Sequence, residues 1–223
     1  MTKVLPAIIP VNKVQLEEEI NKVSSFADFI QVDIADGTFA PVKTWPYNSR
    51  DEEYFEQLKT QNTGWPKWEY VDIELHMMVS NPENILEEWI STGISSVVVH
   101  IEATENFQKI IDICKNNEVS VGVAVKPSTD ISKIESIVSQ IDFIQVMGSD
   151  NIGRHGVELE EKAIERIKEL RKLYPERIIA IDIGVTTETA ENLVRAGANK
   201  LISGGAILNS ENPEEVFDFL SSL

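Results

Sequence analysis

Residues 28–36 read Asp-Phe-Ile-Gln-Val-Asp-Ile-Ala-Asp, and apolar and polar side chains alternate along most of this stretch. Such alternation is typical of a β-strand with two different faces. Ile30, Val32 and Ile34 share one face, whereas Gln31 and Asp33 share the other. In a closed β/α barrel the apolar face lies under the surrounding helices and the other face lines the interior. We therefore expect Gln31 and Asp33 to point into a barrel.

Similar strand patterns recur along the chain and alternate with helical patterns. We expect strands at residues 4–9, 28–35, 70–78, 96–102, 119–125, 141–147, 177–183 and 200–203. We expect helices near residues 13–24, 51–60, 82–92, 104–116, 131–139, 158–173, 187–196 and 213–222. Eight β/α units without a break in composition favour the α/β class, with one (β/α)8 TIM barrel over residues 1–223. A doubly wound open sheet is the alternative, but its strands usually form near-continuous apolar runs.

The composition excludes several classes of partner. The 223 residues include 37 acidic and 20 basic side chains, for a net charge of −17. Such a charge repels nucleic acid and anionic membranes, and no apolar run is long enough to span a bilayer. Cys114 is the only cysteine, so neither an internal disulfide nor a cysteine-based zinc site is expected. With no secretory signal visible, we expect a cytoplasmic protein.

Five ionisable residues are expected inside the barrel or at the ends of its strands. They are Asp33, His76, His100, Lys126 and Asp182. One such residue would usually be interior filling with satisfied hydrogen bonds. Five together indicate a site, because each buried charge is costly unless it is paired or bound to a metal. Barrel active sites lie at the C-terminal ends of the strands, where these residues are expected.

Asp33 and Asp182 are the candidate catalytic pair. They belong to the second and seventh strands, on opposite sides of the expected barrel interior. Two carboxylates that flank one carbon can act as base on one face and as acid on the other, which inverts a centre next to a carbonyl. A divalent metal can stabilise the resulting enediolate. Asp33, His76 and Asp182 are suitable ligands by type for zinc, iron or manganese.

Glycine-rich loops after the last three strands indicate a phosphate site. Barrels often bind phosphate with the loops after the seventh and eighth strands, because free backbone N–H groups favour an anion. In the loop of residues 148–156, Arg154 and His155 could add positive charge, although a flexible surface turn is equally compatible with this loop. The candidate substrate- and phosphate-binding residues are His76, Met78, Met147, Gly153, Gly156, Gly184, Gly204 and Gly205.

The connection after the second strand is long, at about residues 37–69. It contains Trp45, Trp65 and Trp68. These residues could form an aromatic lid over the barrel mouth or an oligomer contact. Packing beneath a loop is the commoner role of such tryptophans.

Several segments resemble motifs of the ribulose-phosphate 3-epimerase family. Residues 31–41, Gln-Val-Asp-Ile-Ala-Asp-Gly-Thr-Phe-Ala-Pro, resemble its His-x-Asp-x-Met-Asp-Gly-x-Phe-Val-Pro signature. Further matches follow in the same order at residues 76–83, 100–103, 182–185 and 196–207. The resemblance implies a barrel that interconverts D-ribulose 5-phosphate and D-xylulose 5-phosphate, or a close ketose phosphate. It also implies a homo-oligomer with Asp33 and Asp182 as acid/base groups, and a divalent metal (zinc, iron, manganese or cobalt).

Two departures from the family pattern leave alternatives open. Gln31 stands where the family has its first metal-binding histidine, and it is a weak ligand for zinc, so the metal could be weakly bound or absent. A non-catalytic barrel that binds a sugar phosphate is therefore one alternative. Lys126 stands where the family usually has asparagine. A Schiff-base aldolase that uses Lys126 is the other alternative.

Overall fold

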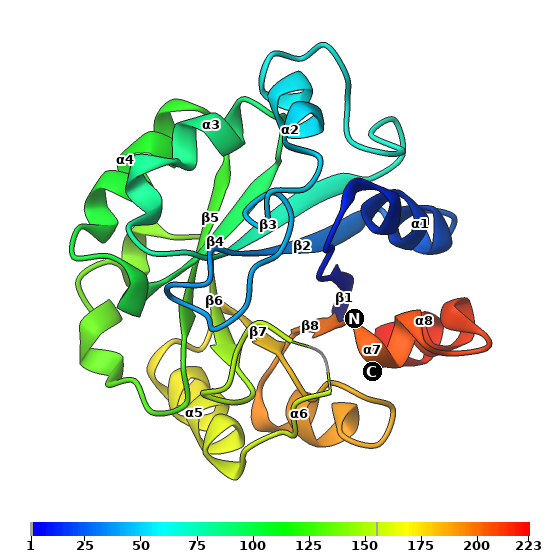
Figure 1. The fold of residues 1–223 in the computed structure, drawn as a ribbon. Helices are drawn as coiled ribbons and strands as arrows, with labels where there is room; N and C mark the ends of the chain where they lie inside the picture. Colours follow the sequence, from blue (N-terminus) through cyan, green and yellow to red (C-terminus); the bar gives the residue numbers. More distant parts are fainter. Residues whose placement is uncertain (1, 155) are drawn as a thin grey trace.

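Eight parallel strands form a closed barrel in the computed structural model, which describes residues 2–154 and 156–223 (Figure 1). The strands are β1 (Lys3–Ile8), β2 (Phe29–Ala35), β3 (Asp72–Met78), β4 (Ser96–His100), β5 (Ser120–Val125), β6 (Phe143–Met147), β7 (Ile178–Asp182) and β8 (Lys200–Ser203). Each strand pairs with the next along the chain, and β1 pairs with β8. The fold class is as predicted, and every expected strand agrees within two residues at each end.

The helices surround the barrel (Figure 1). They are α1 (Lys13–Val23), α2 (Glu52–Lys59), α3 (Leu86–Ile90), α4 (Phe107–Asn116), α5 (Glu161–Leu173), α6 (Ala190–Ala196), α7 (Gly205–Leu208) and α8 (Pro213–Ser221). The short helix α7, between β8 and α8, has no counterpart among the expected helices. None of the helices within residues 2–154 and 156–223 has the length and apolar character needed to cross a bilayer.

One expected α-helix is wrong. The segment of residues 131–139 contains two short 3₁₀ segments instead, Ile131–Ile134 and Val138–Gln140. Its buried isoleucines, Ile131, Ile134 and Ile137, recur every three residues. A 3₁₀ turn has three residues, so the segment Ile131–Ile134 keeps Ile131 and Ile134 on the same side, where both pack into the large hydrophobic cluster.

The two faces of the strands pack into separate cores, as the alternating pattern predicts. Ile30, Val32 and Ile34 belong to the large cluster between the strands and the helices, together with Leu16 and Ile20 of α1. A smaller cluster contains inward-facing residues: Ala35, Met78, Val98, Ala124, Phe143, Met147 and Ala180. The helices therefore cover the apolar face of the strands, and the barrel interior is left to the other set of residues.

The N-terminal half of the barrel interior is filled by a buried ion pair. Lys200 Nζ lies 2.7 and 2.6 Å from the two carboxylate oxygens of Glu74, and Ser96 donates a hydrogen bond to the same carboxylate at 2.9 Å. Lys200 also lies 3.8 Å above the ring of Phe143. Gly122 leaves room for that ring, because a Cβ there would be 2.3 Å from it. These inward polar residues therefore fill the barrel at the end away from the C-terminal rim.

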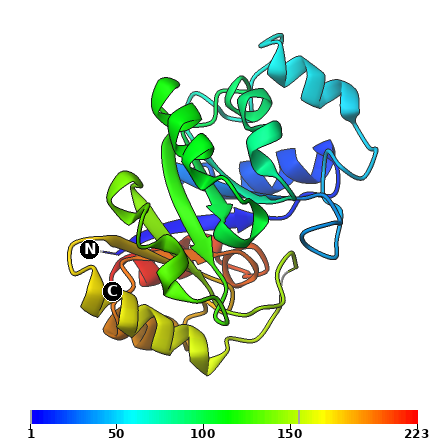
Figure 2. The ribbon, with the colours of Figure 1, turned by 90° about the vertical axis from the view of Figure 1, so that its left-hand side faces the viewer.

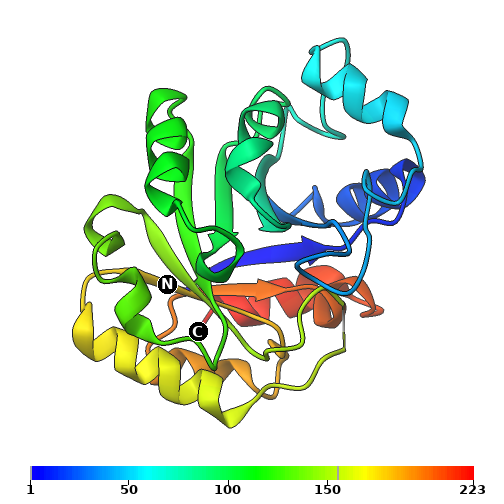
Figure 3. The same ribbon diagram turned by 60° about the vertical axis from the view of Figure 1, so that its left-hand side comes forward.

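The tryptophans of the long connection pack outside the barrel. Trp45 and Trp65 are buried, and each lies close to Trp89 of α3, with ring centroids 6.1 and 6.5 Å apart. Helix α2 extends outward from the barrel (Figures 2 and 3), and its Tyr54 and Phe55 pack against Trp45, with ring centroids 5.7 and 5.9 Å away. Trp68 is 66% exposed. The packing interpretation is thus the correct one for Trp45 and Trp65, which do not form a lid.

The buried ion pair leads to a prediction about stability. Replacing Lys200→Met should lower the free energy of unfolding by about 3–5 kcal/mol, because it leaves the Glu74 carboxylate buried without its partner. The double variant Lys200→Met/Glu74→Leu should recover most of this loss, since both charges are then removed. Urea unfolding followed by circular dichroism measures both effects. A double variant less stable than Lys200→Met would contradict the interpretation.

Candidate functional site

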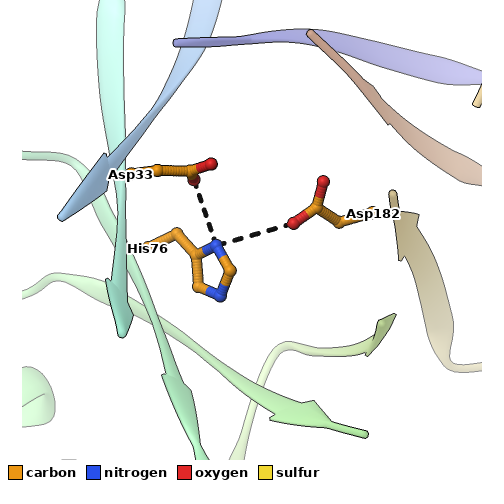
Figure 4. A group of neighbouring side chains, drawn as sticks. All are labelled: Asp33, His76 and Asp182. Carbon is orange, nitrogen blue, oxygen red and sulfur yellow. Dashed lines mark hydrogen bonds and ion pairs between the residues drawn. The ribbon is translucent and has the colours of Figure 1, made fainter. Parts of the chain in front are cut away.

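Three predicted residues meet at the C-terminal ends of strands that are distant in sequence. Asp33 of β2 lies beside His76 of β3, because the register of the two strands pairs these residues, and Asp182 is the last residue of β7. His76 Nδ1 lies 3.0 Å from Asp33 Oδ1 and 3.6 Å from Asp182 Oδ2 (Figure 4). All three side chains are buried. One ligand atom from each lies within 4.8 Å of the others, which is compact enough to hold one metal ion.

The other side of His76 contacts a second histidine. His76 Nε2 lies 3.0 Å from His100 Nε2, and His100 Nδ1 lies 3.2 Å from Glu102 Oε2. Glu102 Oε1 accepts hydrogen bonds from the Lys126 backbone N–H at 3.0 Å and from the Thr129 hydroxyl. The sequence analysis gives no role to Glu102. The sequence does place Glu102 two residues after His100, which puts both side chains on the same face of the expected strand.

Burial and neighbouring charges shift the pKa values of these groups. Burial, with the charge of Asp33, raises the pKa of Asp182 to about 7. Burial alone would lower the pKa of His76, but its hydrogen bond to Asp33 and the nearby carboxylates outweigh burial and raise it. Burial lowers the pKa of His100 to about 4. Although burial opposes it, the hydrogen bond from His100 helps to lower the pKa of Glu102 to about 2. At neutral pH, His100 is therefore neutral and Glu102 is charged.

A cavity of about 390 Å³ opens beside the two aspartates. Seven of the eight predicted substrate-binding residues line it: Met78, Met147, Gly153, Gly156, Gly184, Gly204 and Gly205. His76 is fully buried beneath them. Arg154 also lines the cavity, and so does Asn209, which the sequence analysis missed. His155, the other candidate source of positive charge in this loop, lies outside the described residues.

The backbone after β7 turns sharply toward this cavity. Ile183 and Gly184 both have a positive φ, of 78° and 73°. Such a φ is a true outlier for a β-branched residue and costs about 1–3 kcal/mol. Gly184 also avoids a clash, because a Cβ there would lie 2.6 Å from the Cβ of Leu159. The turn places the backbone of residues 183–185 along the cavity, next to Asp182.

Gln31 is buried on the inward face of β2, two residues before Asp33. Within residues 2–154 and 156–223, neither its side-chain oxygen nor its side-chain nitrogen has a hydrogen-bond partner. A buried amide without partners costs free energy unless another group satisfies it. The donors of Asp33, His76 and Asp182 suit a divalent cation, and the free amide oxygen of Gln31 is a further candidate donor. These residues therefore fit a metal site.

Lys126 lies at the rim, just after β5. Its Nζ lies 4.7 Å above the ring of Phe39, and that ring lies 4.9 Å from the ring of His100. The carboxylate of Asp36 accepts the Phe39 N–H at 3.0 Å and so helps to shape the turn that carries this ring. In the described part of the chain, the residues that line the cavity do not include Lys126. This geometry gives no support to a Schiff base at Lys126.

Comparison with known proteins identifies similar sequences. A model of the ribulose-phosphate 3-epimerase family matches residues 3–208. The ribulose-phosphate 3-epimerase of Schizosaccharomyces pombe is 27% identical, and the alignment covers 98% of this chain and 92% of that protein. The ribulose-phosphate 3-epimerase of Bacillus subtilis is 28% identical, and the alignment covers 93% of this chain and 92% of that protein. The chloroplastic ribulose-5-phosphate-3-epimerase of Arabidopsis thaliana is 29% identical, and the alignment covers 95% of this chain and 73% of that protein.

Solved structures with the same fold are more distant in sequence. A 3-hexulose-6-phosphate synthase from Salmonella typhimurium superimposes with a TM-score of 0.72 at 17% identity, covering 99% of this chain and 97% of that chain. A mutant tryptophan synthase alpha-subunit from Pyrococcus furiosus superimposes with a TM-score of 0.69 at 17% identity, covering 100% of this chain and 97% of that chain. At this level of identity the likeness supports the barrel fold alone.

The raised pKa of Asp182 predicts a pH-dependent stability for the metal-free protein. Folding raises this pKa from its ordinary value of 3.8 to about 7, so between these values Asp182 holds a proton in the folded chain but not in the unfolded chain. Its contribution to stability therefore falls as pH rises from about 4 to 7 and is constant above that. As pH rises through this range, the free energy of unfolding of Asp182→Asn should increase relative to that of the wild type by up to about 4 kcal/mol. Urea unfolding at several pH values tests this; a constant difference between the two proteins would contradict it.

The same site predicts a response to metal. Because a cation competes with protons for Asp33, His76 and Asp182, zinc should raise the melting temperature of the wild type more at pH 8 than at pH 5. Asp182→Asn should respond less at both pH values, since one carboxylate ligand is removed. Thermal unfolding with and without zinc, after treatment with a chelator, measures this. An equal response at both pH values would contradict the assignment of the site.

Proposed function

The chain belongs to the ribulose-phosphate 3-epimerase family and is an isomerase that acts on carbohydrate phosphates; from this premise we propose that it interconverts D-ribulose 5-phosphate and D-xylulose 5-phosphate or a close ketose phosphate. The observation that carries the proposal is the position of Asp33 and Asp182. They approach the same imidazole from β2 and β7, and both line the cavity. A substrate carbon held between them would have one carboxyl group on each face.

The two aspartates would exchange protons with C3 of the ketose. One carboxylate accepts the C3 proton, and the electron pair of the broken C–H bond moves into an enediolate. The other carboxyl group then donates its proton to the opposite face of C3, which inverts that centre. Asp182, with its pKa raised to about 7, suits the role of donor at neutral pH, and Asp33 suits the role of base. The roles reverse for the opposite reaction.

A divalent cation would be held by Asp33, His76 and Asp182, with the Gln31 amide oxygen as a weaker fourth donor. Zinc, iron, manganese and cobalt all suit this donor set. When bound, such a cation supplies Lewis-acid stabilisation for the negative oxygen of an enediolate. Because an amide oxygen is a harder ligand than imidazole, the replacement of histidine by Gln31 favours manganese over zinc in comparison with a site that has two histidines.

The glycine-lined end of the cavity would hold the phosphate. Gly184, Gly204 and Gly205 bring backbone close to the cavity without side chains in between. In the first turn of α7, the N–H groups of Gly205 and Ala206 have no acceptor within the helix and can donate to an anion. Arg154 would supply a positive charge from the opposite loop. This charge matters because the chain as a whole carries a net charge of −17.

The reaction itself is tested by following ribulose 5-phosphate in deuterated water by proton NMR. The wild type should exchange the C3 proton for deuterium and form xylulose 5-phosphate. Asp33→Asn and Asp182→Asn should each lower turnover by at least 100-fold, because each removes one of the two proton-transfer groups. Metal content is measured on the same samples. Binding without exchange in the wild type would favour the alternative of a non-catalytic sugar-phosphate-binding barrel, whereas full activity in both variants would end the two-base mechanism.

The role of Arg154 gives a separate prediction. Arg154→Ala should raise KM for ribulose 5-phosphate about tenfold or more with a smaller change in kcat, because a charge-assisted hydrogen bond contributes about 1.5–3 kcal/mol. Steady-state kinetics at low and high salt measures the effect, which should shrink as salt screens the charge. Arg195→Ala is the matched control, because Arg195 is an exposed residue of α6 paired with Glu191. A KM within twofold of the wild type would remove Arg154 from the phosphate site.

The homo-oligomer that the family resemblance implies stays a prediction. Light scattering coupled to gel filtration measures the mass of the assembly directly.

A further inference from the structure

A continuous series of side-chain contacts runs from the two aspartates to Glu102, in the short 3₁₀ turn Ile101–Ala103 that follows β4. His76 contacts Asp33 and Asp182 through Nδ1 and contacts His100 through Nε2. His100 in turn contacts Glu102 through Nδ1. We call His76, His100 and Glu102 the histidine relay. His76 and His100 are fully buried, so within the relay bulk water does not compete for their ring nitrogens.

The protons of the relay can be placed by counting donors and acceptors. Glu102 is a carboxylate and can only accept, so His100 Nδ1 must carry a hydrogen. A neutral imidazole has one N–H, and burial favours the neutral ring of His100. His100 Nε2 is therefore an acceptor. The nitrogen that faces it at 3.0 Å, His76 Nε2, must then be the donor.

This placement determines which atom of His76 faces the aspartates. Without a cation, the Asp33 carboxylate also accepts a hydrogen from His76 Nδ1, at 3.0 Å. When a cation displaces that hydrogen, the relay keeps the remaining proton on Nε2, so the lone pair of the neutral ring lies on Nδ1, the atom that lies between Asp33 and Asp182. We propose that Glu102, acting through His100, is a positioning residue that holds a proton on His76 Nε2, so that Nδ1 is the nitrogen that binds the metal. The inference rests on the metal site of the proposed function and assigns a role to two residues outside that site.

Both members of the relay beyond His76 are held in place by further contacts. The His100 ring contacts the rings of both His76 and Phe39, whose centroids lie 5.1 and 4.9 Å away. The second oxygen of Glu102 is occupied by the Lys126 N–H and the Thr129 hydroxyl, so its first oxygen is left for His100. Neither group can easily turn away from the relay.

Loss of Glu102 would release this control. Without an acceptor at Nδ1, His100 can place its proton on Nε2 and donate to His76. His76 Nε2 then becomes the acceptor, and the His76 proton moves to Nδ1, where Asp33 accepts it at 3.0 Å. A cation could then bind Nδ1 only if the His76 proton returned to Nε2 and the His100 proton returned to an Nδ1 atom that has lost its acceptor. The relay therefore changes metal affinity although Glu102 does not touch the metal.

The first test measures zinc affinity of the full chain by competition with a chelator. Glu102→Ala should weaken zinc binding by about 10- to 100-fold, the usual effect of removing a group that orients a metal-binding histidine. Glu105→Ala is the matched control, because Glu105 is an exposed carboxylate in the same connection, and it should bind zinc like the wild type. Circular dichroism checks that each variant is folded. An affinity of Glu102→Ala within twofold of the wild type would overturn the proposal.

A double-mutant cycle separates positioning from a merely structural role. His100→Phe keeps a ring against His76 and Phe39 but removes both nitrogens, and it should weaken zinc binding to a similar extent. In that background Glu102→Ala should have no further effect larger than twofold, because its only route to His76 is gone. If Glu102→Ala weakens zinc binding by its full factor in the His100→Phe background as well, Glu102 acts by another route and the proposal fails.

The tautomers are read directly by nitrogen-15 NMR of the histidine rings in the zinc-loaded wild type. The expected state has a proton on His76 Nε2 and on His100 Nδ1, with His76 Nδ1 bound to zinc. Zinc on His76 Nε2, or a proton on His100 Nε2, would overturn the proposal. This result does not depend on turnover, so it can support the relay in a protein that fails to epimerise ribulose 5-phosphate.

Discussion

Two buried carboxylates share one imidazole, and the functional end of the barrel depends on this arrangement. Asp33 and Asp182 enter from β2 and β7 and meet at His76 Nδ1. Two negative charges this close and this buried require a proton or a cation between them. The raised pKa of Asp182 is one expression of that requirement, and the fit to a divalent metal is the other. The proposed acid/base chemistry and the proposed metal binding would thus both satisfy the same electrostatic requirement.

The barrel separates this costly arrangement from the part that stabilises the fold. Toward the start of the strands the interior is closed by Glu74, Lys200 and Phe143, where the opposite charges satisfy each other. At the C-terminal ends the interior opens into a cavity, and the aspartates have no basic side chain as a permanent partner apart from His76. Within residues 2–154 and 156–223, His76 is therefore the basic side chain that both aspartates contact. The division follows the general rule that barrel enzymes react at one end and are stabilised at the other.

Two of the departures from the family pattern, Gln31 and Lys126, have different consequences in three dimensions. Gln31 leaves an amide without partners in the interior, at the strand position two residues before Asp33. The Lys126 ammonium group instead lies over the ring of Phe39. Its backbone N–H donates a hydrogen bond to Glu102 and so helps to position this residue of the histidine relay. Gln31 therefore changes the donors that the proposed metal site contains, whereas Lys126 lies at the edge of the site and does not line the cavity.

Much of the architecture follows from the sequence alone. Alternation in the strands determined which side chains face inward, and because parallel strands end at the same rim, it also indicated that Asp33, His76 and Asp182 would meet. The pairing of Lys200 with Glu74, 126 residues away, could not be predicted, and neither could the contact of His76 with His100. Periodicity specifies the face on which a side chain lies but not the neighbour across the barrel that it reaches. That choice depends on strand register and side-chain rotamers, which only the closed tertiary structure decides.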